Sequence, residues 1–443
     1  MKYTLLLLFI LTHYFSFSQF QKIGSLSEAK CWNSAVRAGD SILVIGGDMS
    51  LGVSSKIEVY YPKENKWGKT IEMPSGVSAP ACVVGDSAIY IAGGTVKDSR
   101  GTRTSDKLFI LKKGKFQEVE LNEPVLFYAG VKLGNTIIFR EGIEDFTTSS
   151  MSTMSVVINE STNTITYETI ENPLSFRAVA NSATVAIYAG GYDKNGTISK
   201  RVDIYNKTTN EWTTSELSEA RFDCTAAYAD GKFYVIGGGL NNAKSSSAVD
   251  VFDSEGKFIE TMNLDVPRAM SFVAVTENKL VMVGGITWDS RITSYDAVHR
   301  NISVYNFKTD EWENDKYLDK SLYGHTALIG FDNAVYLAGG GEWNGSGWLR
   351  DLQVYDLTAS VGEEFRSVIS IYPTSVNDVI NISGVDFSNE NSTVEILDIH
   401  GRSIISNPIN NFNTIDVSGL KQGVYVAKVI DQGNIYSQKF VKK

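Results

Sequence analysis

The chain has 443 residues, of which 43% are hydrophobic and 21% charged, and its formal net charge at pH 7 is −10. This length accommodates one large domain and a smaller one. The acidic balance, with no run of Lys or Arg, argues against nucleic acid as a partner. Beyond the N-terminus no apolar stretch approaches the ~20 residues of a membrane span, so no transmembrane segment is expected.

Residues 1–18 are predicted to be a secretory signal peptide. Lys2 provides the charged start, residues 5–11 form the apolar centre, and residues 16–18 (SFS) give a small-x-small cleavage site before Gln19. We therefore expect an exported mature chain that begins at Gln19.

Residues 19–357 repeat one short motif, an apolar β-branched run that ends in two glycines. The copies are ILVIGG (42–47), IYIAGG (89–94), the degenerate IIFREG (137–142), AIYAGG (186–191), FYVIGG (233–238), LVMVGG (280–285) and VYLAGG (335–340). Their terminal pairs are 47, 48, 49, 47, 47 and 55 residues apart. A period near 50 predicts a β-propeller.

The GGG at 237–239 raises the question of a phosphate-binding loop. A dinucleotide fingerprint needs a third glycine where Asn242 stands, and the sequence that follows has no helical period. We therefore interpret the glycines as strand corners, where a positive φ and close backbone approach are needed.

Each unit continues with a strand that ends in an aromatic residue, a polar turn and often a Trp, as in IEVYYPKENKW, VDIYNKTTNEW and ISVYNFKTDEW. The expected aromatic pairs are Tyr61 with Trp67, Tyr205 with Trp212 and Tyr305 with Trp312. The double glycine, the Tyr and the spaced Trp resemble the kelch family over most of residues 19–357. The resemblance implies an all-β propeller of four-stranded blades.

Seven endings predict seven blades, with six as the alternative if the degenerate third unit is not a blade. The last unit has no Trp strand after LQVYDL at 352–357. Residues 19–23 match an outer strand, so we expect them to complete the seventh blade and join the two ends of the propeller.

The tail differs from the repeats. After a linker at 358–367, residues 368–443 alternate short strands with Asn, Asp and Gly turns, which predicts a small β-sandwich. It resembles the C-terminal sorting domain of the Por (type IX) secretion system of Bacteroidetes, although Thr374-Ser375 replaces the usual Asn-Pro. The matching residues are Tyr372-Pro373, Asp398-x-x-Gly401, Ile415-Asp416 with Leu420, Gly423-Val424-Tyr425 and the basic end 439–443. The resemblance implies the type IX secretion machinery as a partner and a secreted or cell-surface location.

Loop length marks one face of the propeller for binding. The connections that follow the glycine pairs are long, notably 286–300 and 341–350, whereas those on the other face are tight turns. Trp288, Trp343 and Trp348 lie in these two loops, beside His299. Aromatic faces flanked by polar groups suit sugars, although the same Trp side chains could simply pack the loops onto the propeller.

A second candidate set lies sixteen residues before the glycine pairs, namely Lys30, Arg221 and Arg268, with Tyr323 in the seventh unit. These residues could surround the channel mouth and hold a carboxylate. The alternative is that they make structural hydrogen bonds between blades.

Catalytic signals are weak. The three cysteines Cys31, Cys82 and Cys224 are too few for a disulfide framework and are expected to be buried free thiols. No residues of this sequence have to be assigned to the His, Tyr and Tyr–Cys set that binds copper in the kelch-like oxidases, and neither a cofactor nor a metal is expected.

We therefore interpret the chain as an exported binding module, for glycan or another extracellular polymer. The alternatives are a sugar-directed enzyme, resembling a sialic acid epimerase or an oxidase, and an extracellular protein-binding adaptor.

Overall fold

The computed structural model describes residues 20–98, 101–127, 129–145, 150–241, 244–287, 298–318, 322–323, 327–342, 347–357, 370–372, 375–383, 392–406, 414–431 and 434–443. The predicted signal peptide and the linker lie outside these ranges. Within them the chain is built from strands, apart from one short 3-10 turn, η1 (Pro62–Glu64). No described helix could cross a lipid bilayer.

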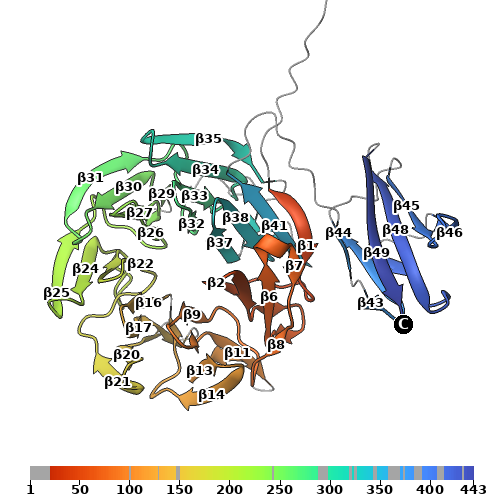
Figure 1. Cartoon of the computed structure of the whole chain (residues 1–443). Coiled ribbons are helices and arrows are strands. Elements are labelled where there is room, and N and C mark those ends of the chain that lie inside the picture. Colours follow the sequence, from red (N-terminus) through yellow and green to blue (C-terminus); the bar gives the residue numbers. More distant parts are fainter. Residues whose placement is uncertain are drawn as a thin grey trace, which may run out of the picture.

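In the described part of the chain, seven antiparallel sheets of four or five strands surround a central axis, with the first strand of each unit innermost (Figure 1). Blade 1 contains β2 (Ser34–Ala38), β3 (Ser41–Ile45), β6 (Lys56–Tyr61), β7 (Lys66–Trp67) and β8 (Ile71–Glu72), and blade 2 contains β9 (Ala81–Val84), β10 (Ile89–Ala92), β13 (Lys107–Lys112) and β14 (Lys115–Glu120). Blade 3 contains β16 (Gly130–Leu133), β17 (Thr136–Arg140), β20 (Met154–Asn159) and β21 (Thr164–Thr169), and blade 4 contains β22 (Ala178–Asn181), β23 (Val185–Ala189), β24 (Arg201–Asn206) and β25 (Glu211–Glu216).

Blade 5 contains β26 (Thr225–Ala229), β27 (Lys232–Ile236), β30 (Ala248–Phe252) and β31 (Phe258–Asn263). Blade 6 contains β32 (Phe272–Val275), β33 (Lys279–Val283), β34 (Asn301–Asn306) and β35 (Glu311–Tyr317). Blade 7 contains β37 (Ala327–Phe331), β38 (Ala334–Ala338), β41 (Asp351–Asp356) and, from the start of the chain, β1 (Gln21–Ser25). Strand β1 pairs antiparallel with β41, Gln21 opposite Val354. The prediction that residues 19–23 complete the last blade is confirmed for residues 21–23.

Smaller sheets follow the glycine pairs on the long-loop face. They are β4 (Asp48–Met49) with β5 (Gly52–Val53), β11 (Thr95–Asp98) with β12 (Gly101–Thr104), β15 (Leu126–Phe127) with β18 (Gly142–Asp145) and β19 (Ser150–Met151), β28 (Gly239–Leu240) with β29 (Lys244–Ser245), and β36 (Leu322–Tyr323) with β39 (Gly341–Glu342) and β40 (Gly347–Trp348).

The double glycine is the joint between neighbouring blades. Both glycines adopt positive φ, 61° and 118° at Gly46 and Gly47. The amide of Gly47 donates to the carbonyl of Val77 in blade 2, and a Cβ on Gly46 would lie 2.2 Å from that oxygen. The same bond recurs around the ring and ends with Gly340 donating to Lys30, so only a residue without a side chain fits here.

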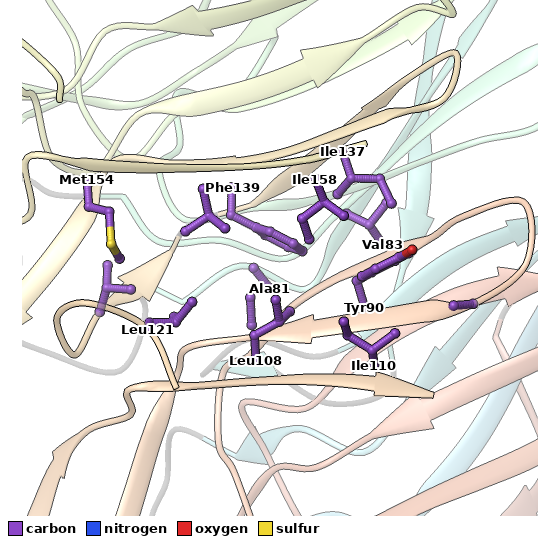
Figure 2. Close-up of a cluster of buried hydrophobic side chains, with 14 residues drawn as sticks. Ala81, Val83, Tyr90, Leu108, Ile110, Leu121, Ile137, Phe139, Met154 and Ile158 are labelled. Atoms are coloured by element: carbon purple, nitrogen blue, oxygen red, sulfur yellow. The ribbon is translucent and has the colours of Figure 1, made fainter. Parts of the chain in front are cut away.

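Apolar faces pack between these joints. Figure 2 shows Ala81, Tyr90 and Leu108 of blade 2 facing Phe139 and Ile158 of blade 3. A single sheet would leave such faces in water, and burial is worth about 25 cal/mol per Å². Each blade therefore depends on its neighbours.

The aromatic pairs follow the predicted pattern with one correction. Tyr205 and Trp212 have ring centroids 5.0 Å apart, and Tyr305 and Trp312 lie 5.1 Å apart. In blade 1 it is Tyr60, not Tyr61, that packs on Trp67 at 5.1 Å. Tyr60 has the seven-residue spacing of the other pairs, and alternation along the strand turns Tyr61 the other way.

The tail forms two sheets. One contains β42 (Ser370–Tyr372), β44 (Val379–Ser383) and β47 (Thr414–Asp416), and the other β43 (Ser375–Val376), β49 (Asn434–Lys442), β48 (Gly423–Asp431), β45 (Ser392–Leu397) and β46 (Ser403–Ser406). Buried side chains from both, such as Ile380 and Phe440, form one cluster. This is the small β-sandwich that the alternating pattern predicted.

Candidate functional site

A repeated backbone feature surrounds the axis just before the innermost strands. Among the described residues, the one fourteen positions before the glycine pair has a positive φ in five blades, although none of the five is glycine. These residues are Trp32 (53°), Ala79 (49°), Phe176 (57°), Asp223 (50°) and Met270 (53°). A left-handed conformation costs a non-glycine residue about 1–2 kcal/mol, so the fold must impose it. We call these five residues the axial ring.

Backbone hydrogen bonds between successive blades hold the axial ring. The amide of Ala79 donates to the carbonyl of Trp32 at 2.6 Å. Asp223 donates to Phe176, and Met270 donates to Asp223, both at 3.1 Å. Because each link ties one blade to the next, the side chains of the axial ring project from a rigid frame.

All five residues of the axial ring line a cavity of ≈ 610 Å³. The hairpins β4–β5 and β11–β12 border it through Asp48 and Lys97, which places the cavity on the long-loop face. A second cavity, of ≈ 260 Å³, is lined by Phe176, Asp223 and Met270 together with residues of the inner strands. We call the larger one the axial cavity.

Asp223 is the most unusual group of the axial cavity. Burial raises the pKa of its carboxyl to about 7. An aromatic cluster lies beside it, in which Tyr192 stacks on Phe176 and meets Phe222 edge-on, with ring centroids 5.1 and 5.7 Å away. The Asp223 carboxylate has no hydrogen bond or ion pair within the described ranges.

Polar groups complete the wall. Asn33 is buried and donates from Nδ2 to the carbonyl of Ala338, whereas its Oδ1 receives no hydrogen bond from the described residues. Burial raises the pKa of Asp48, and nearby Lys97 opposes that shift. The cavity therefore combines aromatic surface with hydrogen-bond acceptors.

The predicted ring of basic residues at the channel mouth is corrected. Lys30, Arg221 and Arg268 are 0–1% exposed. Lys30 pairs with Glu58 at 2.7 Å, Arg221 pairs with Asp250, and Arg268 donates to Ser303 at 2.6 Å. The three side chains are bonded within their own blades, so their hydrogen bonds are structural, but these bonds do not run between blades as the alternative expected.

The remaining predicted residues are only partly described. Trp288 and Trp343 lie outside the described residues. Tyr323 is in β36, where it pairs with Gly341, and Trp348 is half-buried in β40, opposite the same residue. Trp348 is not among the described residues that line the axial cavity.

His299 contacts Thr287 through its Nε2. Burial, and then the charge of Arg268, lower the His299 pKa to about 4. At neutral pH its imidazole is therefore uncharged.

The three cysteines are free. Cys82 lines the axial cavity and Cys224 the smaller one. Burial raises the thiol pKa of Cys82 to about 12 and that of Cys224 to about 11, so both are protonated. Within the described part of the chain, no three His, Cys, Asp or Glu residues gather as metal ligands would.

Sequence reasoning missed the axial ring. A signal was present, because the residue fourteen positions before each glycine pair varies from Trp to Ala, Phe, Asp and Met within an otherwise regular repeat. Varied chemistry at a fixed structural position is typical of a position available for recognition.

Comparisons with known proteins agree with this architecture. Residues 370–443 match the family described as "Secretion system C-terminal sorting domain". The chain is 23% identical over 311 residues to Kelch-like protein 36 of Mus musculus, which covers 66% of this chain and 49% of that protein. Spermatocyte protein spe-26 of Caenorhabditis elegans is also 23% identical, over 66% of this chain and 42% of its own length. The chain thus spans less than half of each relative.

Two solved structures share the fold. "Structure of YjhT" superposes with a TM-score of 0.51 and 13% identity, over 66% of this chain and 99% of that one. "Novel fungal alcohol oxidase with catalytic diversity among the AA5 family, in complex with copper" gives a TM-score of 0.59 and 15% identity, over 96% and 99%. At such identities the likeness concerns the fold alone.

Proposed function

This chain is a kelch-type propeller with a type IX sorting domain, which directs export to the cell surface or beyond it, and from that premise we propose that it is an extracellular binding protein for glycans. The axial cavity carries this proposal. Its volume of ≈ 610 Å³ lies within the ≈ 300–1,000 Å³ usual for ligand sites.

The chemistry of the wall supports a sugar ligand. Trp32 and Phe176 offer aromatic surface on which the C–H face of a sugar ring can stack. The carboxylate of Asp223 offers acceptors for hydroxyl groups. Trp348 in β40 remains a candidate for contacts to longer polymers, as do Trp288 and Trp343, which lie outside the described residues.

Glycan-array binding of the mature full-length protein tests the proposal. We expect bound glycans whose signal falls at least about tenfold in Trp32→Ala, because stacking on the half-buried indole of Trp32 is lost. Phe258→Ala is the matched control, since Phe258 is exposed on the outer strand of blade 5. Absence of glycan binding by the wild type, or equal loss in both variants, would contradict the proposal.

A sugar-directed enzyme is the second candidate, favoured by the carboxyl of Asp223. A group with a pKa of about 7 can donate and accept protons at neutral pH. Conversion of free sugars, followed by NMR and lost in Asp223→Asn but retained in Trp348→Ala, would favour this candidate.

A further inference from the structure

The axial cavity holds a carboxylate without a counter-charge. The charged side chains that line it are Asp48, Lys97 and Asp223, and Lys97 is exposed. Arg177 reaches the smaller cavity, but its guanidinium already binds Glu141 at 3.1 Å and Asp203 at 2.6 Å. Two carboxylates thus face one lysine.

The backbone keeps Asp223 in this position. Its amide donates to Phe176 and its carbonyl accepts from Met270, within the left-handed turn of the axial ring. These bonds tie the backbone of Asp223 to blades 4 and 6. A largely desolvated carboxylate without a counter-charge is best compensated by a cation from outside.

The surrounding side chains are also suited to a cation. Trp32 and Phe176 line the same cavity, and aromatic faces attract ammonium groups within about 6 Å. An ammonium group carries three donors and no acceptor, so it complements the carboxylate of Asp223.

We infer that the axial cavity binds an amino sugar, with its protonated amine on Asp223 and its ring against Trp32 and Phe176. The inference rests on the proposed glycan function and narrows it to one chemical class. The cavity is far larger than an ammonium group requires, which leaves room for the pyranose ring and for contacts between its hydroxyls and the wall.

Two oligosaccharides provide the decisive pair of probes. Oligomers of glucosamine and of N-acetylglucosamine share one backbone, but only the first carries amines. We expect calorimetry with the mature full-length protein to show at least about tenfold tighter binding of the glucosamine oligomer, because a charge-assisted hydrogen bond is then formed in a desolvated site.

Asp223→Asn should abolish this preference while keeping the shape of the site. The matched control is Asp230→Asn, because Asp230 is exposed in the tight turn between β26 and β27. Unfolding curves of both variants verify that they are folded. Equal affinity for the two oligomers, or an unchanged preference in Asp223→Asn, overturns the inference.

The outcomes also separate this inference from the proposed function. If array glycans bind at Trp32 without any preference for amines, the glycan function stands and the amine assignment falls. If no glycan of either kind binds, both fall. If a lysine-rich peptide binds the wild type but not Asp223→Asn, whereas glucosamine oligomers do not bind, the site recognises amines of proteins and the sugar assignment is wrong.

Discussion

Two carboxylates of blade 5 differ in how fully they are satisfied. Asp250 is fully buried and accepts hydrogen bonds from the amide of Ser218, the guanidinium of Arg221 and the hydroxyl of Thr261. Asp223, only two residues after Arg221, faces the axial cavity and accepts none from the described residues. A saturated buried charge stabilises the scaffold, whereas an unsaturated one marks a place for a ligand.

The other blades show that this ion pair is not the only solution at these positions. At the positions of Arg221 and Asp250, blade 1 has Lys30 and Glu58, but blade 2 has Val77 and Phe109. All four side chains are buried. The repeat therefore tolerates both a complete ion pair and a complete apolar pair, whereas we expect the removal of one charge from an existing ion pair to be costly.

The largest effect should come from breaking the pair in blade 5. Asp250→Ala leaves Arg221 buried without its counter-charge, which should lower the free energy of unfolding by about 3–5 kcal/mol. Urea denaturation monitored on the propeller measures this. The double variant Arg221→Leu/Asp250→Leu imitates the apolar blades and should recover most of the loss. Wild-type stability of Asp250→Ala would contradict the view that the Asp250 carboxylate stabilises the scaffold.

A pH-dependent effect should distinguish Asp223. Its folded-state pKa of about 7 lies above the ~3.9 of an unfolded Asp, so the folded protein retains the proton and loses stability as the pH rises from about 4 to 7. Asp223→Asn should match the wild type near pH 4. By pH 8 it should be more stable, by at most about 4 kcal/mol and by less where water enters the cavity.

Unfolding in urea at pH 4, 6 and 8 tests this expectation, with Asp230→Asn as the control for an exposed carboxylate. Curves of wild type and Asp223→Asn that stay parallel across the range would show that the Asp223 carboxyl is not perturbed.

The smallest effect concerns blade 6, where the pair is incomplete. Arg268 donates to Ser303 instead of a carboxylate, and burial lowers its pKa to about 10. Ser303→Asp should stabilise the propeller by about 1 kcal/mol, because the guanidinium is already desolvated. Ser303→Ala should cost about 1 kcal/mol through the lost hydrogen bond. Thermal unfolding that changes in the same direction for both variants would refute this interpretation.

Periodicity made the fold predictable. The glycine pairs recur because only glycine fits where each blade meets the carbonyl of the next, as Gly46 and Gly47 do at Val77. Blade 3 is the exception, because Glu141 stands in the first glycine position, with φ 58°. The buried carboxylate of Glu141 pairs with Arg177 of blade 4. A neighbouring charge offsets the lost glycine, which no local pattern reveals.

The site was less predictable, for a geometric reason. Alternation along a strand gives the direction of a side chain only while the backbone stays extended. Between Arg221 and the start of β26, the backbone passes through the left-handed conformation at Asp223. Arg221 therefore points into its blade and Asp223 lines the cavity, opposite to the assignment that spacing alone suggested.

A crystal structure of the mature protein with a bound glucosamine oligomer would show whether Asp223 binds the amine. We expect a sugar ring in the axial cavity, with its amine nitrogen about 2.7–2.9 Å from a carboxylate oxygen of Asp223. An oligomer bound only on the outer strands or in the outer loops, with the cavity left to solvent, would contradict it.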